Sequence, residues 1–177
     1  MTGEREHRRR RSLPIPRAAV LAGRGLADTA LVTWSLVVGT ALGFAVGYRM
    51  HGPVTAGLAA LGLCVLFSFA FEWVFITIGL VAGTAQAAQG MSVLMTVLVF
   101  VSSAYVPVAS MPGWLQPVAE HQPVTPMVNA VRGLAGGPQA EALFPHTTAY
   151  YVGLSIIWAA AITVVFGVVA AARFSRR

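Results

Sequence analysis

The chain has 177 residues, of which 56% are hydrophobic and only 10% are charged, and its mean hydropathy is +0.72. A soluble globular domain carries about 25% charged residues, so the composition excludes that class and indicates an integral protein of the lipid bilayer. The net charge of +6 comes from twelve arginines and no lysine. Without lysine there is no Walker A nucleotide site, so any ATP-driven activity needs another chain.

The arginines gather at the two ends of the sequence. Ten of the twelve lie within residues 5–24 or 173–177, and only Arg49 and Arg132 lie between. This is the positive-inside pattern of multi-span membrane proteins, and it argues against a nucleic-acid partner. We therefore expect both termini in the cytoplasm of a cell-membrane protein, with residues 1–12 as a basic cytoplasmic N-terminus.

Four apolar runs are long enough to cross a bilayer, which needs about 20 residues. They cover residues 28–48, 54–82, 91–108 and 148–172. An even number of spans places both termini on one side, in agreement with the arginines. The predicted fold class is an all-α integral membrane protein with four transmembrane helices, in which residues 28–177 form the membrane domain and 109–147 lie outside the cell.

Residues 13–27 join the basic start to the first span. Two prolines, the first of them Pro14, hold the chain extended, because proline disfavours helix at the preceding residue. From Arg17 onward apolar residues recur at helical spacing, with Arg24 on the face of Arg17, which predicts a short amphipathic helix at the cytoplasmic surface. Two roles stay open, a membrane anchor and a docking helix for a cytoplasmic partner. Asp28 follows, where negative charge suits a helix N-terminus.

The first span contains Gly39, Gly43 and Gly47, spaced four residues apart. Glycines at this spacing let two helix backbones approach closely. Another span of this chain or a dimer partner would serve equally well as the neighbour.

Glu72 is the one ionisable residue deep inside a predicted span. A carboxylate at a helix centre costs roughly 2.5–3.5 kcal/mol on insertion scales, so it should face protein or a water-filled cavity. One interpretation is a part in a substrate path or a proton relay. The other is a neutral carboxyl bonded to Ser68, one turn earlier, or to another helix.

Enzyme and metal motifs are absent from the sequence. His7, His51, His121 and His146 are scattered, and no pair has metal-ligand spacing. Neither HExxH nor GxSxG occurs. We expect no catalytic residue, no metal and no cofactor on this chain.

Residues 106–126, "VPVASMPGWLQPVAEHQPVTP", hold five of the ten prolines. Proline breaks helices, so Pro107 should end the third span. Ser110 can cap a short helix, and Pro117 would limit its length. Trp114 suits the headgroup level of a membrane.

A second short helix should follow. Thr125 can cap it with Pro126 at the favoured first position, and Gly136 and Gly137 should stop it. Each helix would have about 10 residues and a length of roughly 15 Å, half the hydrocarbon thickness. The pair is therefore predicted to be extracellular and interfacial or re-entrant.

Three motifs in this region carry a family likeness: "SSAYVP" (102–107), "MPGWLQ" (111–116) and "HQPVTP" (121–126), followed by a helix with Asn129 and Arg132. With them the chain resembles the membrane subunit of type 2 ATP-binding-cassette exporters, in particular the daunorubicin-resistance-like drug permeases.

A second likeness lies in "SLPIPRAAVLAGRGLAD", residues 12–28, which is similar to that family's cytoplasmic segment between its second and third spans. The resemblance implies that 13–27 is a coupling helix in contact with a cytoplasmic ATP-binding-cassette ATPase subunit, where ATP would bind. The implied contact residues are Pro14, Arg17, Arg24 and Asp28.

The resemblance also implies an extracellular gate built from the short outer helices. Its residues would be Pro112, Trp114, His121, Pro123, Pro126, Asn129 and Arg132. The expected function is ATP-driven export of drug-like or lipid-like amphipathic compounds, conferring antibiotic resistance, by a permease homodimer or with a split-permease partner. The family's first two spans are missing, so the alternative is a truncated, non-transporting remnant or a structural assembly partner.

Overall fold

The computed structural model describes residues 17–82 and 84–175, and every regular element among them is helical. The elements are α2 (Arg17–Ala45), α3 (Val54–Ala82), α4 (Ala85–Phe100), the 3-10 helix η1 (Val108–Ser110), α5 (Gln116–His121), α6 (Val124–Glu141) and α7 (Thr148–Ser175). Within the described residues, three helices are long and apolar enough to cross a membrane: α2 from Gly25, α3, and α7 as far as Arg173. The prediction of an all-α membrane protein is confirmed.

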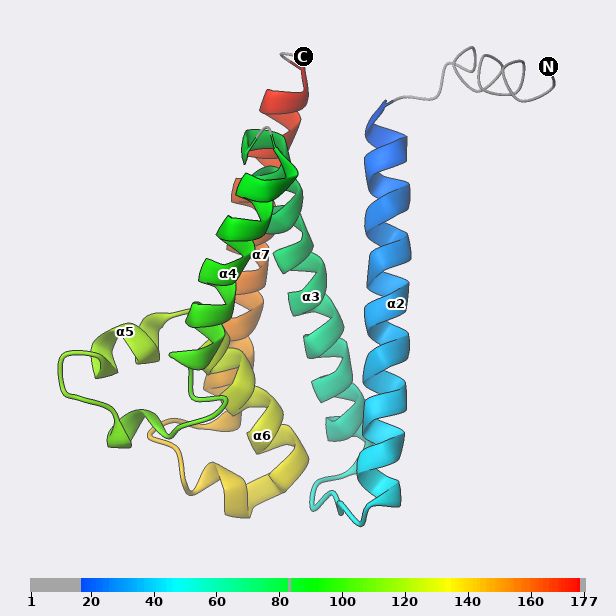
Figure 1. Cartoon of the computed structure of the whole chain (residues 1–177). Helices are drawn as coiled ribbons and strands as arrows, with labels where there is room; N and C mark the ends of the chain where they lie inside the picture. The colour runs from blue at the N-terminus through cyan, green and yellow to red at the C-terminus, as the bar shows by residue number, and fades with distance from the viewer. Residues whose placement is uncertain (1–16, 83, 176–177) are drawn as a thin grey trace.

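The centre of the molecule is the pair α3 and α7, which pack along one another (Figure 1). At 29 and 28 residues, each is about 42–44 Å long, more than the hydrocarbon thickness. Small residues bring the helices close, since Ala70 and Ala159 are almost completely buried where they meet. A hydrogen bond also joins α3 to α7, because the Thr77 hydroxyl donates to the carbonyl of Phe166 at 3.1 Å.

Helix α6 packs across α3 and α7 at the end of the bundle opposite the described chain ends (Figure 1). A second buried cluster forms there from Leu63 of α3, Ala130 of α6 and Tyr151 of α7. Helix α6 is thus part of the protein core on one side.

Helices α2 and α4 flank this core, and each packs on α3 more sparsely (Figure 1). The apolar side chains of α2 are largely exposed, including Leu31, Trp34 and Leu42 at 60–68% of their surface. Lipid tails are as apolar as these side chains, so a lipid environment tolerates such exposure.

The glycine series of α2 does not form the expected packing surface within this chain. An added Cβ at Gly39 would meet nothing within 4 Å, and one at Gly43 would reach only Tyr48, at 4.0 Å. Gly47 lies beyond the helix with a φ of +107°, a backbone conformation that residues other than glycine rarely adopt. Its role is to turn the chain after α2.

The structure does not divide α2 at residue 28. Residues 17–27, expected as a separate surface helix, continue into the span without a break. The physical reason is that no proline interrupts residues 17–45, and Gly23 and Gly25 are tolerated inside the helix. Pro14 and the basic segment 1–12 lie outside the described residues.

The bounds predicted for the third span are wrong. Helix α4 begins at Ala85, not residue 91, because the Thr84 hydroxyl accepts a hydrogen bond from the amide of Ala87 and caps the helix. It ends at Phe100 because the next residues form turns, in which the Ser102 hydroxyl accepts from the amide of Ala104. Its 16 residues give a helix of about 24 Å.

Candidate functional site

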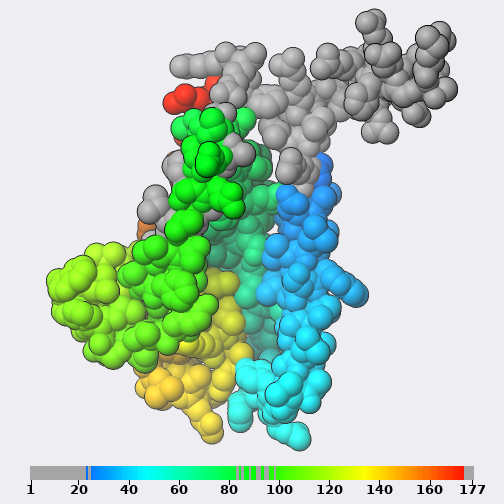
Figure 2. Space-filling view, in the orientation of Figure 1, coloured from blue at the N-terminus to red at the C-terminus, as the bar shows by residue number. Residues whose placement is uncertain are grey.

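Residues 101–123 form a lobe that projects from the side of the bundle (Figures 1 and 2). The hydroxyl of Ser110 donates to the Pro107 carbonyl and α5 begins only at Gln116, with Leu115 as its N-cap, so the predicted helix cap is wrong. Pro117 stands in the first turn of α5, where it favours the start of the helix rather than its end. At 77% exposure, Trp114 is free to meet a membrane surface or a partner.

A buried hydrogen-bonded cluster, the outer hub, joins the end of α4 to the start of α6. We define it as Ser103, Gln122, Thr125 and Asn129, all buried. Ser103 donates from its amide to the Thr125 hydroxyl at 3.2 Å and from its hydroxyl to Oδ1 of Asn129 at 3.0 Å. Nε2 of Gln122 also reaches the Thr125 hydroxyl, at 3.4 Å. Such groups hold the chain in one register because leaving any of them unpaired is unfavourable.

The outer hub corrects the predicted start of α6. Thr125 is not the cap, because the helix begins at Val124 with Pro123 in the N-cap position. The Thr125 side chain is therefore free to bond Ser103 across the hub. Thr125, Asn129 and Arg132 follow at spacings of four and three, so they share one helix face. Arg132 completes the row by donating from Nη2 to the Ala104 carbonyl at 3.0 Å.

Helix α6 also fits closely against two other parts of the chain. A Cβ on Gly133 would collide with the Thr148 side chain at the start of α7, and the Thr148 hydroxyl donates to Oε2 of Glu141 at 2.6 Å. The turn between α2 and α3 docks through the His51 amide, which donates to the Ala135 carbonyl at 3.1 Å. Helix α6 is thus held by the end of α4, by the α2–α3 turn and by the start of α7.

Gly137 breaks the regular helix as expected. Its φ of +65° lies in the left-handed region that favours glycine, and residues 138–141 continue beyond the kink as a further short turn of helix. The regular part of α6 is therefore longer than expected, and α5, with six residues, is shorter.

The seven predicted gate residues fall into two groups. Pro126 and Asn129 are buried, Arg132 lies on the same helix, and Pro123 precedes it. The others, in the lobe around α5, are exposed: Pro112, Trp114 and His121. The structure therefore brings four of these residues together along α6 and separates three.

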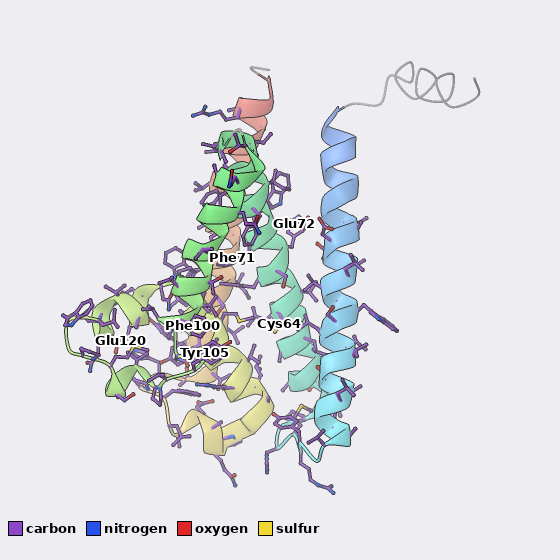
Figure 3. All side chains as sticks on the ribbon, viewed as in Figure 1. Cys64, Phe71, Glu72, Phe100, Tyr105 and Glu120 are labelled. Atoms are coloured by element: carbon purple, nitrogen blue, oxygen red, sulfur yellow. The ribbon has the colours of Figure 1, made fainter. Side chains whose placement is uncertain are left out.

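Glu72 lies on the face of α3 that looks toward α2 (Figure 3). Its Oε2 accepts a hydrogen bond from the Thr29 hydroxyl of α2 at 3.2 Å. Ser68, one of the two partners considered for this carboxyl group, does not bond it, because the Ser68 hydroxyl donates to the carbonyl of Cys64 in its own helix at 2.8 Å. The alternative of a partner on another helix is the one that forms.

A crevice of about 340 Å³, the Glu72 crevice, opens between α2 and α3 at this point. Its lining is almost entirely apolar apart from the carboxyl group and consists of Gly23, Gly25, Leu26, Phe69, Glu72, Trp73 and Ile76. Gly25 is buried, and a Cβ there would lie 3.3 Å from Oε1 of Glu72. The missing side chain lets the α2 backbone approach the carboxyl group.

Three of the predicted coupling residues belong to the described chain, and they lie at the other end of the bundle from α6. Arg17, Arg24 and Asp28 belong to the first turns of α2, and the described ends of the chain, Arg17 and Ser175, lie at the same end (Figure 1). Asp28 is exposed and immediately precedes Thr29.

Several residues of these sites were missed from the sequence. Thr29, Gly25, Ser103, Gly133 and Thr148 make close contacts between helices. Their residue type could have indicated them, since hydroxyl-bearing and small residues inside apolar runs commonly mediate helix contacts. No group of His, Cys, Asp and Glu suited to a metal ion occurs in the described part of the chain.

Comparison with known proteins adds the family. Residues 7–135 match the family described as ABC-2 type transporter. The chain belongs to the ABC-2 type transporter family. This match confirms the likeness to type 2 ATP-binding-cassette permeases, and with three apolar helices the chain is a membrane-embedded member.

Relatives of this ABC-2 chain carry drug-resistance names. The probable doxorubicin resistance ABC transporter permease protein DrrC of Mycobacterium tuberculosis is 31% identical over 167 residues, 93% of this chain and 56% of the relative. The daunorubicin resistance ABC transporter permease protein DrrB1 of Streptomyces coeruleorubidus is 30% identical over 128 residues, 72% of this chain and 45% of the relative. The chain spans about half the length of these relatives. No solved structure matches it significantly.

Proposed function

We propose that the chain serves as a permease subunit in ATP-driven export of drug-like or lipid-like amphipathic compounds. The observation that carries the proposal is the clamped helix α6, which seats three of its gate residues in or beside a buried hub at one end of an apolar bundle. The drug-resistance names of the relatives support an amphipathic substrate.

The proposed topology has four crossings, with α4 as the third. At about 24 Å α4 is shorter than the hydrocarbon layer, but the turn at 101–104 extends it toward the outer hub. Both termini would then lie in the cytoplasm, which the arginine distribution supports. In this orientation α5 and α6 are short extracellular helices.

The proposed partner is a cytoplasmic ATP-binding-cassette ATPase subunit, which would bind and hydrolyse ATP. It would dock at the end of the bundle where α2 begins, through Pro14, Arg17, Arg24 and Asp28. Since α2 is continuous, its first turns would form an extension of a span rather than a separate surface helix.

A second permease chain is also part of the proposal. The exposed apolar surface of α2 supports a homodimer or a split-permease partner. Within the outer gate, Pro126, Asn129 and Arg132 would form the packed hinge. Pro112, Trp114 and His121 would form the exposed cover.

Co-expression with the ATPase encoded nearest to this chain tests the proposal. We expect the two proteins to purify together and vesicles containing both to move an amphipathic dye only with ATP. Arg17→Glu should reduce the complex at least about tenfold, because it reverses a charge at the proposed docking end. Arg49→Glu, an equal charge change beyond the other end of α2, should leave it unchanged.

Two outcomes would overturn the proposal in different ways. If no complex forms, or if both arginine variants behave alike, the coupling assignment is wrong. If a complex forms but no ATP-dependent transport occurs, the chain is an assembly partner and not a working permease.

A further inference from the structure

The Glu72 crevice combines one carboxyl group with two aromatic rings. Phe69 and Trp73 line it one turn apart on α3, with ring centroids 6.2 Å apart and planes at 83°. Aromatic faces attract cations, and Trp does so best. A carboxyl group beside such rings is the arrangement that recognises an organic cation with an apolar body.

The carboxyl group has no cationic partner among the side chains that the structure describes. The Thr29 hydroxyl supplies a hydrogen bond to one oxygen, and Asp28 adds a second negative charge nearby. A carboxylate in an apolar setting is unfavourable unless it is paired. A bound cation would pair with this carboxyl group.

The crevice is placed so that a ligand would reach it from the bilayer. Glu72 lies ten residues before the end of α3, about 15 Å along the axis and roughly 8 Å inside the hydrocarbon layer if α3 is centred in it. At the rim, Leu26 is 72% exposed. The volume of about 340 Å³ lies at the lower end of the range of small-molecule sites.

We propose that the Glu72 crevice binds amphipathic monocations, with the positive charge at Glu72 and the apolar body against Phe69, Trp73 and Ile76. The inference rests on the proposed function, of which it specifies the substrate class and the site. It adds that the compound binds between α2 and α3. The binding side of α2 is the one that carries Gly25 and Thr29, not the lipid-exposed face.

Equilibrium dialysis of the purified full chain in phosphatidylglycerol nanodiscs tests this. The probe is tetraphenylphosphonium, a permanent cation, and triphenylphosphine oxide is its neutral comparator, with empty nanodiscs subtracted. We expect the cation to bind at least about tenfold more tightly than the comparator. Glu72→Gln should remove most of this preference while leaving the neutral compound within about threefold.

A matched control separates the site from general effects of charge. Glu141→Gln also removes a carboxylate that accepts a hydrogen bond from a threonine, but in the outer segment. It should leave binding unchanged. Trp73→Leu should weaken the cation by about threefold or more through loss of the cation–π contact. Gly25→Leu, which fills the crevice, should weaken the binding of both probes. This variant still tests the site if Glu72→Gln fails to fold.

The overturning results are equally distinct. Equal binding of the cation to wild type and Glu72→Gln would remove the site, as would equal affinity for the two probes. Competition by added phosphatidylethanolamine would assign the crevice to a lipid amine instead. The dialysis contains no ATPase, so the two proposals can fail separately. If the chain binds the cation but forms no complex with the ATPase, only the permease function is disproved. If the complex forms and transports but the chain does not prefer the cation, only the crevice proposal is disproved.

Discussion

The contact between α6 and α7 gives a sharp test of how the outer segment is held. Gly133 is buried, and an alanine Cβ there would collide with the Thr148 hydroxyl and lie 2.9 Å from its Cγ2. The Thr148 side chain cannot simply rotate away, because its hydroxyl donates to Glu141 at 2.6 Å. Gly133→Ala must therefore separate the helices or break this bond.

The expected size of the effect follows from three opposing contributions. Overpacking a close contact costs about 1–3 kcal/mol, and a lost hydrogen bond to a charged group costs about 1.5–3 kcal/mol. Replacing a helical glycine by alanine returns about 1 kcal/mol. Since one of the two costs applies, Gly133→Ala should lower the free energy of unfolding by about 0.5–2 kcal/mol.

Unfolding of the purified chain in mixed micelles, by titration with a denaturing detergent, measures this difference. Gly39→Ala is the matched control, since it makes the same change in a helix where a Cβ meets nothing within 4 Å. It should be neutral or stabilise by up to about 1 kcal/mol. Thr148→Ala removes the colliding atoms, so the double variant Gly133→Ala with Thr148→Ala should be less destabilised than the sum by about 1–2 kcal/mol.

The reasoning is refuted if Gly133→Ala unfolds like Gly39→Ala. It is also refuted if the two outer substitutions are additive, because a shared contact must produce coupling. Either result would mean that α6 and α7 are not in close contact at Gly133 and Thr148.

Three further predictions concern the outer segment. Ser103→Ala and Asn129→Ala should each lower the unfolding free energy by about 1–3 kcal/mol, and together by less than the sum, because both remove the same buried Ser103–Asn129 hydrogen bond; additivity would contradict the hub. Arg132→Gln should cost less than about 1 kcal/mol, since this exposed side chain makes one hydrogen bond, to Ala104; a larger loss would indicate a further partner. The fluorescence of Trp114, taken as the difference between wild type and Trp114→Phe, should be quenched more by lipids brominated near the headgroup than by deeply brominated ones. The reverse order would exclude an interfacial lobe.

Hydropathy predicts the helices that consist of one unbroken apolar run. Residues 54–82 and 148–172 were expected and are found as Val54–Ala82 and Thr148–Ser175. It fails for α4, where the run continues to residue 108 but the helix stops at Phe100. Ser102 and Ser103 end it by bonding backbone and distant side chains. Mean hydropathy does not carry that information.

Glu72 was identifiable as a candidate because its charge is out of place in an apolar run. Its partner was not, because Thr29 is 43 residues away, whereas Ser68 is one turn away. A serine inside a helix tends to donate to the carbonyl four residues earlier, and Ser68 does so. Local spacing therefore favoured the wrong hydroxyl, and the pairing of α2 with α3 decided the correct one.

The two sites depend on α3 in different ways, and this difference indicates which helix would move in a working transporter. Near Leu63, α6 is fixed to α3 and α7 by a buried cluster and by contacts from three sides. About 14 Å further along α3, α2 meets Glu72 through the hydrogen bond of Thr29 beside an open crevice. Separating α2 from α3 would therefore disturb far less packing than displacing α6. Because α2 runs unbroken from Arg17 to the crevice, a push on its first turns would reach Thr29 through a rigid helix of about 18 Å. If the proposed ATPase docks at these turns, its movement would act on the crevice before it acts on α6.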